Sequence, residues 1–277
     1  MILYPNAKIN LGLNIVGKRT DGYHDLETVF VPVRALHDRL ELSLSEESVP
    51  YCFEQEGIAV DCANEDNLVV RAYLRMCELF PQVKNVHIRF CKQIPFGAGL
   101  GGGSSDAAHV VKGVNALFGL GLTASEMEQI VSPLGADCAF FVQNKPLFAE
   151  GIGDIFSAVP DTLVEQLEGK WLLLVKPECA VSTRAAYKGV VVRHPDVPLR
   201  KALQLPIEQW QTYVINDFEQ SVFPQFPAIA SAKEQLLAAG AVYAAMSGSG
   251  ATVFGIFRER PEWKPEETFY HLEQMKF

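Results

Sequence analysis

The stretch PFGAGLGGGSS, from Pro95 to Ser105, decides how the rest of this sequence is interpreted. It holds five glycines and two serines in eleven residues, and glycine lets the backbone come close to a ligand. Apolar residues recur behind it with helical spacing, at Ala107, Val110, Val111, Val114, Leu117 and Phe118. The free N–H groups and partial positive charge at a helix start suit a phosphate. A flexible surface turn is the competing interpretation, but a plain turn needs no such glycine cluster, so the stretch predicts an anion site.

The known glycine-rich nucleotide loops do not account for this stretch. Gly97, Gly99 and Gly102 have G-x-G-x-x-G spacing, but a Rossmann unit needs a second strand soon after the helix. A second helix is expected instead, starting at Thr123 with Glu126 completing a capping box. The P-loop pattern G-K-[ST] occurs nowhere in the chain, and neither does a protein-kinase His-Arg-Asp or Asp-Phe-Gly set. The sequence therefore predicts a nucleotide site on another fold.

Outward from this loop, strands and helices mix without strict alternation, which favours the α+β class. Residues 8–16 alternate, with Ile9, Leu11, Leu13 and Ile15 on one face, and predict a half-buried strand with Lys8 and Asn10 on its open face. Asp106 is expected in the first turn of the loop's helix, where a negative side chain is favoured. Further strands are expected at 26–33, 39–44, 86–90, 171–175 and as a pair within 244–257, and further helices at 67–79, 181–190 and 228–239.

Composition limits the classes of partner. The 277 residues are 48% hydrophobic and 21% charged, which is an ordinary globular balance, and the net charge of −9 disfavours nucleic acid. No C-x-x-C pair occurs among the six cysteines, so zinc-ribbon and thioredoxin-like motifs have no support. No signal-peptide pattern and no apolar run of membrane-spanning length is present. These features predict a cytoplasmic protein that does not use a membrane.

Several motifs together resemble one family of enzymes. PFGAGLGGGSSDAA resembles the phosphate-binding motif of the GHMP small-molecule kinases. The N-terminal PNAKINLGLNIVGKRTDGYHDLETVF is similar to the branch of that family that phosphorylates 4-diphosphocytidyl-2-C-methyl-D-erythritol. The same branch is matched, in family order, by LGADCAFFV (134–142), AEGIGD (149–154), VSTRAAYK (181–188), INDFE (215–219) and MSGSGATVFG (246–255). The last twenty residues match none of its motifs.

The resemblance implies transfer of the γ-phosphate of ATP to the 2-hydroxyl of the erythritol moiety, a step of non-mevalonate isoprenoid (terpenoid) biosynthesis. It also implies Mg²⁺ and a two-domain α+β fold with the active site in the cleft between the domains. We expect the N-terminal domain over residues 1–155 and the C-terminal domain over 156–277. The partner is a small molecule, the cytidine diphosphate conjugate of methylerythritol, and the protein is expected to be a monomer or a homodimer.

Two residues match the family's catalytic pair. Asp137 would accept the proton of the substrate hydroxyl, and Lys8 would stabilise the attacking oxygen. The competing interpretations are that Asp137 only caps a helix starting at Cys138, and that Lys8 is an ordinary exposed strand lysine.

Further residues match the family's binding motifs. The ATP phosphates would be held by Pro95, Phe96, Gly97, Ala98, Gly99, Leu100, Gly101, Gly102, Gly103, Ser104 and Ser105, and the adenine would be bordered by Asn67 and Leu68. The substrate would be bound by Asn10, Tyr23, His24, Thr183 and Tyr187. Tyr23 would stack on the cytosine, His24 would bond its edge and Tyr187 would flank it, unless these are the core-facing aromatics of a hairpin. The Mg²⁺ ligands are left open between Ser105 and the phosphate and water oxygens. The turn Ser247–Gly250 either approaches the substrate phosphates or is a structural turn.

Three alternatives stay open at this point. A mevalonate, homoserine or galactose kinase shares the superfamily, but the KRTDGYH turn with its aromatic residues favours a base-containing substrate. A non-catalytic nucleotide-binding protein would have no need of both Lys8 and Asp137. A nicotinamide oxidoreductase is more distant, because only the glycine spacing supports it.

Overall fold

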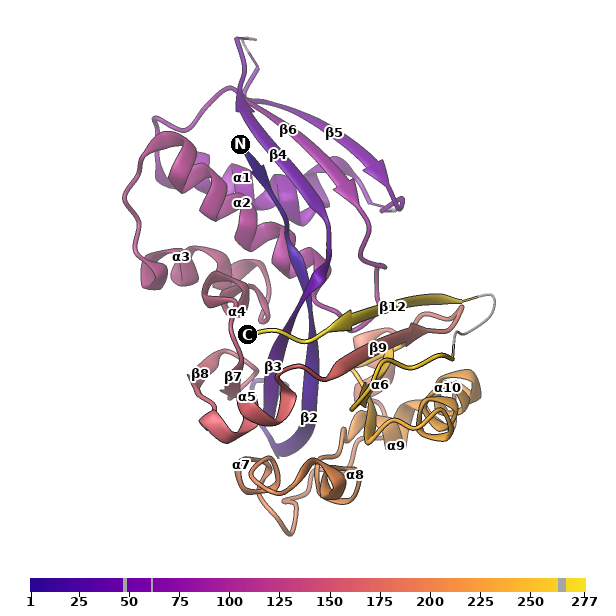
Figure 1. Cartoon of the computed structure of the whole chain (residues 1–277). Helices are drawn as coiled ribbons and strands as arrows, with labels where there is room; N and C mark the ends of the chain where they lie inside the picture. Colours follow the sequence, from indigo (N-terminus) through magenta and orange to yellow (C-terminus); the bar gives the residue numbers. More distant parts are fainter. Residues whose placement is uncertain (47–48, 61, 264–267) are drawn as a thin grey trace. The chain divides into compact units, whose positions relative to one another are not determined.

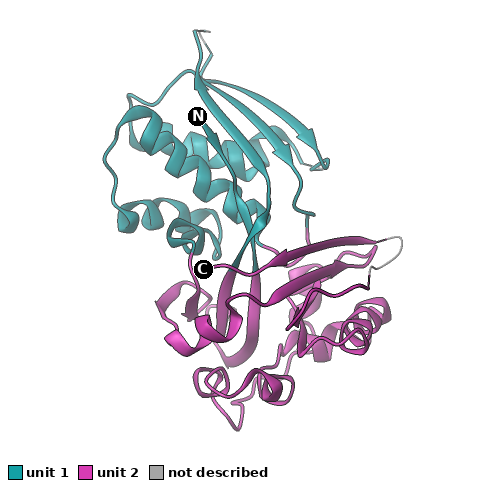
Figure 2. Cartoon of the chain, viewed as in Figure 1, with its two compact units in different colours: residues 1–8, 32–96, 101–144 teal, residues 9–31, 97–100, 145–277 magenta. Residues whose placement is uncertain are grey.

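The computed structural model describes residues 1–46, 49–60, 62–263 and 268–277 (Figure 1). The chain divides into two compact units, each assembled from several segments (Figure 2). Unit 1 comprises residues 1–8, 32–96 and 101–144, and unit 2 comprises residues 9–31, 97–100 and 145–277. Each unit combines helices with sheet, which confirms the α+β class. The domain boundary between residues 155 and 156 and the cleft between domains stay predictions.

Unit 1 contains a four-stranded sheet in the order β1-β4-β6-β5, in which only β5 runs parallel to its neighbour. Its strands are β1 (Ile2–Leu3), β4 (Arg39–Leu44), β5 (Tyr51–Gly57) and β6 (Val86–Lys92). Its helices are α1 (Leu68–Leu79), α2 (Gly102–Phe118), α3 (Ala124–Val131) and α4 (Cys138–Gln143). Figure 1 shows α1 and α2 on one face of the sheet. Leu40, Leu42, Ile88 and Phe90 are buried. Helix α2 packs so closely on this sheet that a Cβ on Gly113 would lie only 2.5 Å from Leu42 Cδ1.

Unit 2 contains two four-stranded sheets, in the orders β2-β3-β7-β8 and β10-β11-β9-β12. The strands are β2 (Asn6–Lys18), β3 (His24–His37), β7 (Leu147–Glu150), β8 (Ile155–Ala158), β9 (Trp171–Lys176), β10 (Tyr243–Met246), β11 (Val253–Phe257) and β12 (Phe269–Gln274). The helices are α5 (Asp161–Leu167), α6 (Thr183–Tyr187), α7 (Leu199–Ala202), α8 (Trp210–Tyr213), α9 (Phe218–Val222) and α10 (Pro227–Ala238). The first residues of β2 and the last residues of β3 belong to unit 1.

Local sequence signals explain several element ends. Thr123 and Glu126 form the predicted capping box at the start of α3. The Asn67 side chain accepts a hydrogen bond from the N–H of Val69 and caps α1. Helix α2 ends at Phe118, and its C-cap Gly119 takes the left-handed conformation that glycine favours. The predicted strand pair within 244–257 is the antiparallel hairpin of β10 and β11, with Met246 opposite Val253.

Three predictions about local structure are wrong. Strand β2 is not half-buried, because every residue from Asn6 to Ile15 is buried, and Lys8 and Asn10 are each only 3% exposed. Helix α6 covers Thr183–Tyr187 and not the whole of 181–190. Helix α2 begins at Gly102, so Asp106 lies beyond its first turn and is buried.

Candidate active site

The glycine-rich loop leads directly into helix α2. Gly97, Gly99 and Gly101 have φ values of 61°, 73° and 69°, in the left-handed region that glycine tolerates best. Gly101 is the N-cap of α2, where no side chain makes a capping hydrogen bond. The first N–H groups of α2 are therefore not capped by a side chain, and a helix start of this kind binds anions.

The predicted catalytic pair lies beside this helix start. Lys8 Nζ is 3.2 Å from Asp137 Oδ2, and the side chains of Lys8 and Asp137 are 4% and 31% exposed. A Cβ added to Gly101 would stand 2.9 Å from Phe141 Cζ and 3.0 Å from Lys8 Cε, so only glycine fits there. Asp137 does occupy the N-cap position of α4, but its side chain makes no capping bond. The carboxylate instead faces the ammonium group of a buried lysine that lies against the glycine loop.

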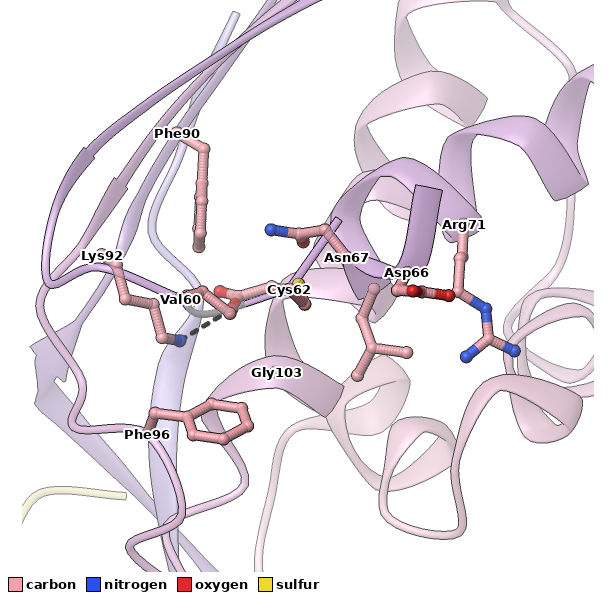
Figure 3. A pocket seen from close by; sticks show the side chains of 11 residues that line it. Val60, Cys62, Asp66, Asn67, Arg71, Phe90, Lys92, Phe96 and Gly103 are labelled. Atoms are coloured by element: carbon pink, nitrogen blue, oxygen red, sulfur yellow. Dashed lines mark hydrogen bonds and ion pairs between the residues drawn. The ribbon is translucent and has the colours of Figure 1, made fainter. Parts of the chain in front are cut away.

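A pocket of about 330 Å³ opens in unit 1 next to the same loop (Figure 3). Two residues expected at the adenine, Asn67 and Leu68, line it together with Gly103 of α2. The Asn67 side chain also donates to Gln55 Oε1 at 3.1 Å, which fixes the capping amide at the pocket edge. The other lining residues are Val60, Cys62, Asp66, Arg71, Phe90, Lys92, Phe96 and Asp106. The structure thus brings the expected adenine residues and part of the glycine loop to one pocket.

Lys92 and its two carboxylate partners were missed by sequence reasoning. Lys92 Nζ donates to Asp38 Oδ2 at 2.5 Å and to Asp106 Oδ2 at 2.8 Å, and the three side chains are 3% exposed or less. Asp38 Oδ1 also accepts the backbone N–H groups of Gln93 and Ile94. The sequence did contain a signal for the burial of Lys92. This lysine continues the alternating row of inward-facing residues on β6, shortly before the glycine loop.

Burial shifts the pKa values of Lys92 and Asp106. Burial raises the pKa of Asp106 well above its usual value, although the Lys92 ammonium opposes that shift. Burial also opposes the charge of Lys92, but the carboxylates of Asp106 and Asp38 outweigh it and hold the pKa of Lys92 above its usual value. Among the described residues, Asp106 Oδ1 finds no hydrogen-bond partner.

In unit 2, the turn between β10 and β11 contacts the first half of the glycine loop. Ser247 Oγ donates to the carbonyl of Gly99 at 2.8 Å and accepts from the N–H of Asn10 at 3.2 Å. The N–H of Thr252 donates to the carbonyl of Ala98. The Asn216 side chain holds the turn by donating to the carbonyls of Met246 and Gly248. Asn10, also predicted to bind substrate, donates from its amide to Thr28 Oγ1 at 3.0 Å.

The residues expected around a cytosine lie in unit 2. The rings of His24 and Tyr187 stack at 4.9 Å with an interplanar angle of 23°, and Tyr187 also meets Phe218 edge-on. Tyr23 is 62% exposed, and Thr183 is exposed at the first position of α6. The structure therefore brings His24 and Tyr187 together and leaves Tyr23 on the surface.

Comparison with known proteins decides the family. The N-terminal domain model of the GHMP kinases matches residues 67–145, and the C-terminal model matches residues 199–264. A 4-diphosphocytidyl-2-C-methyl-D-erythritol kinase of Bacteroides fragilis is 50% identical over 93% of this chain and 92% of its own length. The enzyme of the same name from Cytophaga hutchinsonii is 47% identical over 97% of this chain and 96% of its own length. This chain belongs to the 4-diphosphocytidyl-2-C-methyl-D-erythritol kinase family.

Solved structures agree with this assignment. A crystal structure of a 4-(cytidine 5'-diphospho)-2C-methyl-D-erythritol kinase has a TM-score of 0.76 at 31% identity and covers 92% of this chain and 90% of that one. The mevalonate kinase of Methanococcus jannaschii has a TM-score of 0.75 at 14% identity, over 100% of this chain and 98% of that one, which shows a shared fold. The predicted GHMP kinase fold is therefore confirmed for this member of the 4-diphosphocytidyl-2-C-methyl-D-erythritol kinase family. None of its described helices is both long and apolar enough to cross a membrane.

Proposed function

We propose that this chain transfers the γ-phosphate of ATP to the 2-hydroxyl of 4-diphosphocytidyl-2-C-methyl-D-erythritol, a step of non-mevalonate isoprenoid biosynthesis. The relatives that share about half of its residues carry the name of this kinase. The observation that carries the proposal is the contact of 3.2 Å between Lys8 and Asp137, beside the glycine-capped start of α2. A base and a cation next to an anion site are what phosphoryl transfer to a hydroxyl requires.

Asp137 acts as the general base in this proposal. The substrate hydroxyl oxygen attacks the γ-phosphorus, its proton passes to the Asp137 carboxylate, and the bond from phosphorus to the ADP oxygen breaks. The side chain of Asp137 is 31% exposed, so a hydroxyl can reach it. Buried Lys8 stabilises the negative charge on the attacking oxygen and fixes the position of the carboxylate.

ATP is the co-substrate, and the pocket of Figure 3 suits its adenosine part. Apolar side chains of Val60, Leu68 and Phe90 offer surface for a flat base, and the Asn67 amide offers polar groups at the edge. Gly103 joins this pocket to the start of α2, where the N–H groups receive the phosphates. The residues Pro95–Ser105 then serve the role that the sequence predicts for them.

Mg²⁺ accompanies ATP in this proposal. Mg²⁺ prefers oxygen ligands, and the hydroxyl of Ser104 in the first turn of α2 would supply one. Ser105 fits less well, because it is fully buried and its hydroxyl lies 3.4 Å from His109 Nδ1. Phosphate and water oxygens would complete the coordination. When bound, the ion neutralises the charge that develops on the phosphoryl group.

The aromatic residues of unit 2 recognise the cytosine in this proposal. Tyr23 stacks on the base, His24 bonds its edge and Tyr187 flanks it, because an aromatic face suits any base. The close approach of the His24 and Tyr187 rings supports a common role. Thr183 and Asn10 complete the substrate contacts. A cytoplasmic location and the choice between monomer and homodimer stay predictions.

Release of ADP by the purified chain tests the proposal. With Mg-ATP, we expect release that depends on 4-diphosphocytidyl-2-C-methyl-D-erythritol and is absent with unsubstituted methylerythritol phosphate. Mevalonate, homoserine and galactose serve as competing acceptors, and none of them should stimulate release. Stimulation by one of these acceptors instead of the cytidyl substrate would overturn the proposal, while a folded sample that binds ATP without any turnover would favour a non-catalytic protein.

A further inference from the structure

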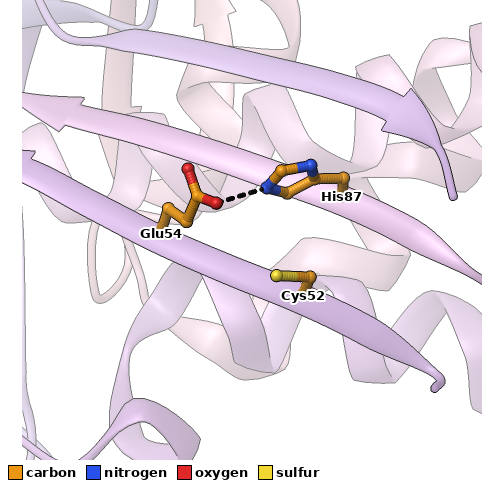
Figure 4. Close-up of side chains that lie close together, drawn as sticks. All are labelled: Cys52, Glu54 and His87. Atoms are coloured by element: carbon orange, nitrogen blue, oxygen red, sulfur yellow. Dashed lines mark ion pairs between the residues drawn. The ribbon is translucent and has the colours of Figure 1, made fainter. Parts of the chain in front are cut away.

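Three side chains that can ligate a metal meet on the sheet of unit 1 (Figure 4). Strand β5 runs parallel to β6 with Cys52 opposite His87, and Glu54 lies two residues further along β5. Side chains alternate along a strand, so Cys52 and Glu54 project from the same face. One ligand atom of each residue, the Cys52 Sγ, a Glu54 carboxylate oxygen and an imidazole nitrogen of His87, all lie within 4.8 Å of one another.

The cluster lies on the face of the sheet that α1 and α2 do not cover. Phe53 is opposite Ile88, and Ile88 is opposite Leu42, which lies against Gly113 of α2. Cys52, Glu54 and His87 alternate with these residues along the two strands, so their side chains project from the opposite face of the sheet. His87 and Glu54 are 24% and 51% exposed in their side chains, and Cys52 is half-buried. The cluster is therefore partly open to solvent.

The contact between His87 and Glu54 is close but incomplete. His87 Nε2 lies 3.0 Å from Glu54 Oε1, yet it is sealed from solvent and makes no acceptable hydrogen bond with the described residues. The other carboxylate oxygen, Oε2, is held by Arg89 Nε at 3.2 Å. Glu54 is thus oriented by a neighbour, as metal-binding carboxylates commonly are, and the His87 nitrogen beside it has no hydrogen bond among the described residues.

We propose that Cys52, Glu54 and His87 form a zinc site with water as the fourth ligand. Thiolate, imidazole and carboxylate are the ligand types of protein zinc sites, and bonds of about 2.0–2.3 Å hold such ligand atoms about 3.3–3.8 Å apart. Side-chain rotation would have to bring the three ligand atoms, which lie within 4.8 Å of one another, to that spacing. A thiolate and a carboxylate together balance the charge of Zn²⁺. Ca²⁺ and Mg²⁺ fit poorly, because both require oxygen ligands and Ca²⁺ takes six or more.

The ion would cross-link β5, at the edge of this sheet, to the strand beside it, β6. Strand β5 is the last strand of the sheet β1-β4-β6-β5, and β6 is the strand it pairs with. Zinc ligands on both strands form a cross-link that exists only in the folded state, so binding stabilises unit 1 by mass action. None of the three residues belongs to the catalytic or nucleotide-binding machinery proposed above.

Zinc titration of the full chain tests the site, with Cys91 as the matched control. Cys91 is a half-buried cysteine on β6, four residues beyond His87 on the same face, and is not one of the three proposed ligands. Zn²⁺ alone is titrated into metal-stripped protein against a chromophoric chelator, in the wild type and in Cys52→Ser, His87→Gln, Glu54→Gln and Cys91→Ser. Co²⁺ serves as a second probe, because a thiolate ligand gives a charge-transfer band and four-coordination gives intense visible bands.

We expect one zinc ion per wild-type chain and an unchanged affinity in Cys91→Ser. The Cys52→Ser and His87→Gln variants should bind at least about tenfold more weakly, and the cobalt charge-transfer band should vanish in Cys52→Ser. Zinc should also raise the melting temperature of the wild type and of Cys91→Ser, but not of Cys52→Ser. Equal zinc affinity in the wild type and Cys52→Ser, or no zinc binding in the wild type, would overturn the proposal. Melting curves without metal confirm that each variant folds.

Discussion

Two groups of lysine and aspartate in unit 1 use the same residue types in opposite ways. Lys8 forms an ion pair with Asp137, whose side chain is 31% exposed. Lys92 forms ion pairs with Asp38 and Asp106, and all three side chains are 3% exposed or less. The first group leaves a carboxylate that a substrate hydroxyl can reach, whereas the second is closed. Accessibility, and not the ion pair itself, separates the catalytic candidate from the structural group.

The energetic consequences of the two groups differ as well. A closed ion pair costs desolvation on both partners, and removing one partner leaves an uncompensated buried charge. The closed group also holds the backbone before the glycine loop, because Asp38 accepts the N–H groups of Gln93 and Ile94. In the open group, the Asp137 side chain makes no capping hydrogen bond to the backbone at the start of α4. We therefore expect substitution to affect mainly catalysis in the first group and mainly folding in the second, whose Lys92 and Asp106 also line the pocket of Figure 3.

The largest effect is expected on turnover when the open group loses its base. Asp137→Asn keeps the size of the side chain but removes the proton acceptor, so kcat should fall by about 10²–10⁴-fold. The apparent affinity for ATP should change little, because Asp137 is not among the residues that line the nucleotide pocket. Steady-state ADP release and ATP titration measure the two quantities. If the Asn variant turned over at the wild-type rate, Asp137 would not be the base.

The next effect is expected on stability when the closed group loses its cation. Lys92→Met leaves Asp38 and Asp106 buried without their ammonium partner, which should lower the free energy of unfolding by about 3–5 kcal/mol. Asp106→Asn is the matched control, because Lys92 then keeps Asp38 and no bare charge is created, so the loss should be smaller. Urea unfolding of the three proteins measures the difference. If both variants lost the same free energy of unfolding, the uncompensated buried charge would not be the cause of the loss.

A smaller effect on stability is expected when the pH is lowered, through His109, which lies one helical turn after the glycine loop. Burial, reinforced by the charge of Lys112, lowers the pKa of His109 to about 4. Between about pH 6.5 and 4 the unfolded chain carries a proton on this imidazole and the folded chain does not, so stability falls as the pH falls. The contribution is about 3 kcal/mol over that range. His109→Gln should remove it, and parallel pH profiles of stability in the two proteins would contradict the assignment.

The smallest effect separates two glycines of the same loop. Gly97 and Gly99 both have positive φ, but a Cβ at 97 would meet nothing within 4 Å, whereas one at 99 would stand 2.0 Å from the carbonyl oxygen of Ser247. Gly97→Ala should cost about 1 kcal/mol of stability from its backbone conformation alone. Gly99→Ala should cost about 2 kcal/mol more, because backbone atoms must move. Equal melting temperatures for the two variants would mean that the backbone of the turn at Ser247 can move away from the new Cβ at little energetic cost.

Local patterns were enough to predict several of the longer elements of the fold. Alternation placed β4 at residues 39–44 and the capping box placed the start of α3, because each depends on neighbours in sequence. Strands β5, β7 and β12 were not predicted, because pairing with strands that are distant in sequence defines them more than their own pattern does. Strand β8, which pairs with neighbouring β7, and several short helices were also not predicted. Strand β12 lies within the last twenty residues, which matched no motif of the family.

The polar groups of the site were harder to predict than its backbone. Alternation placed Lys8 and Asn10 on an open face, but both are buried. Their partners, Asp137 for Lys8 and Thr28 for Asn10, lie far away in sequence. The Lys92 cluster joins residues separated by 54 and 14 positions. A sequence pattern gives the face on which a side chain projects, but not the distant group that makes its burial favourable.

The most direct test of the central claim is the identity of the reaction product. The chain is incubated with Mg-ATP and 4-diphosphocytidyl-2-C-methyl-D-erythritol, and the product is analysed by ³¹P NMR and mass spectrometry. We predict one added phosphate, present as a monoester coupled to carbon 2 of the erythritol moiety, with the diphosphate bridge intact. A phosphate on another hydroxyl, or ADP release without a new phosphoester, would contradict the proposed function.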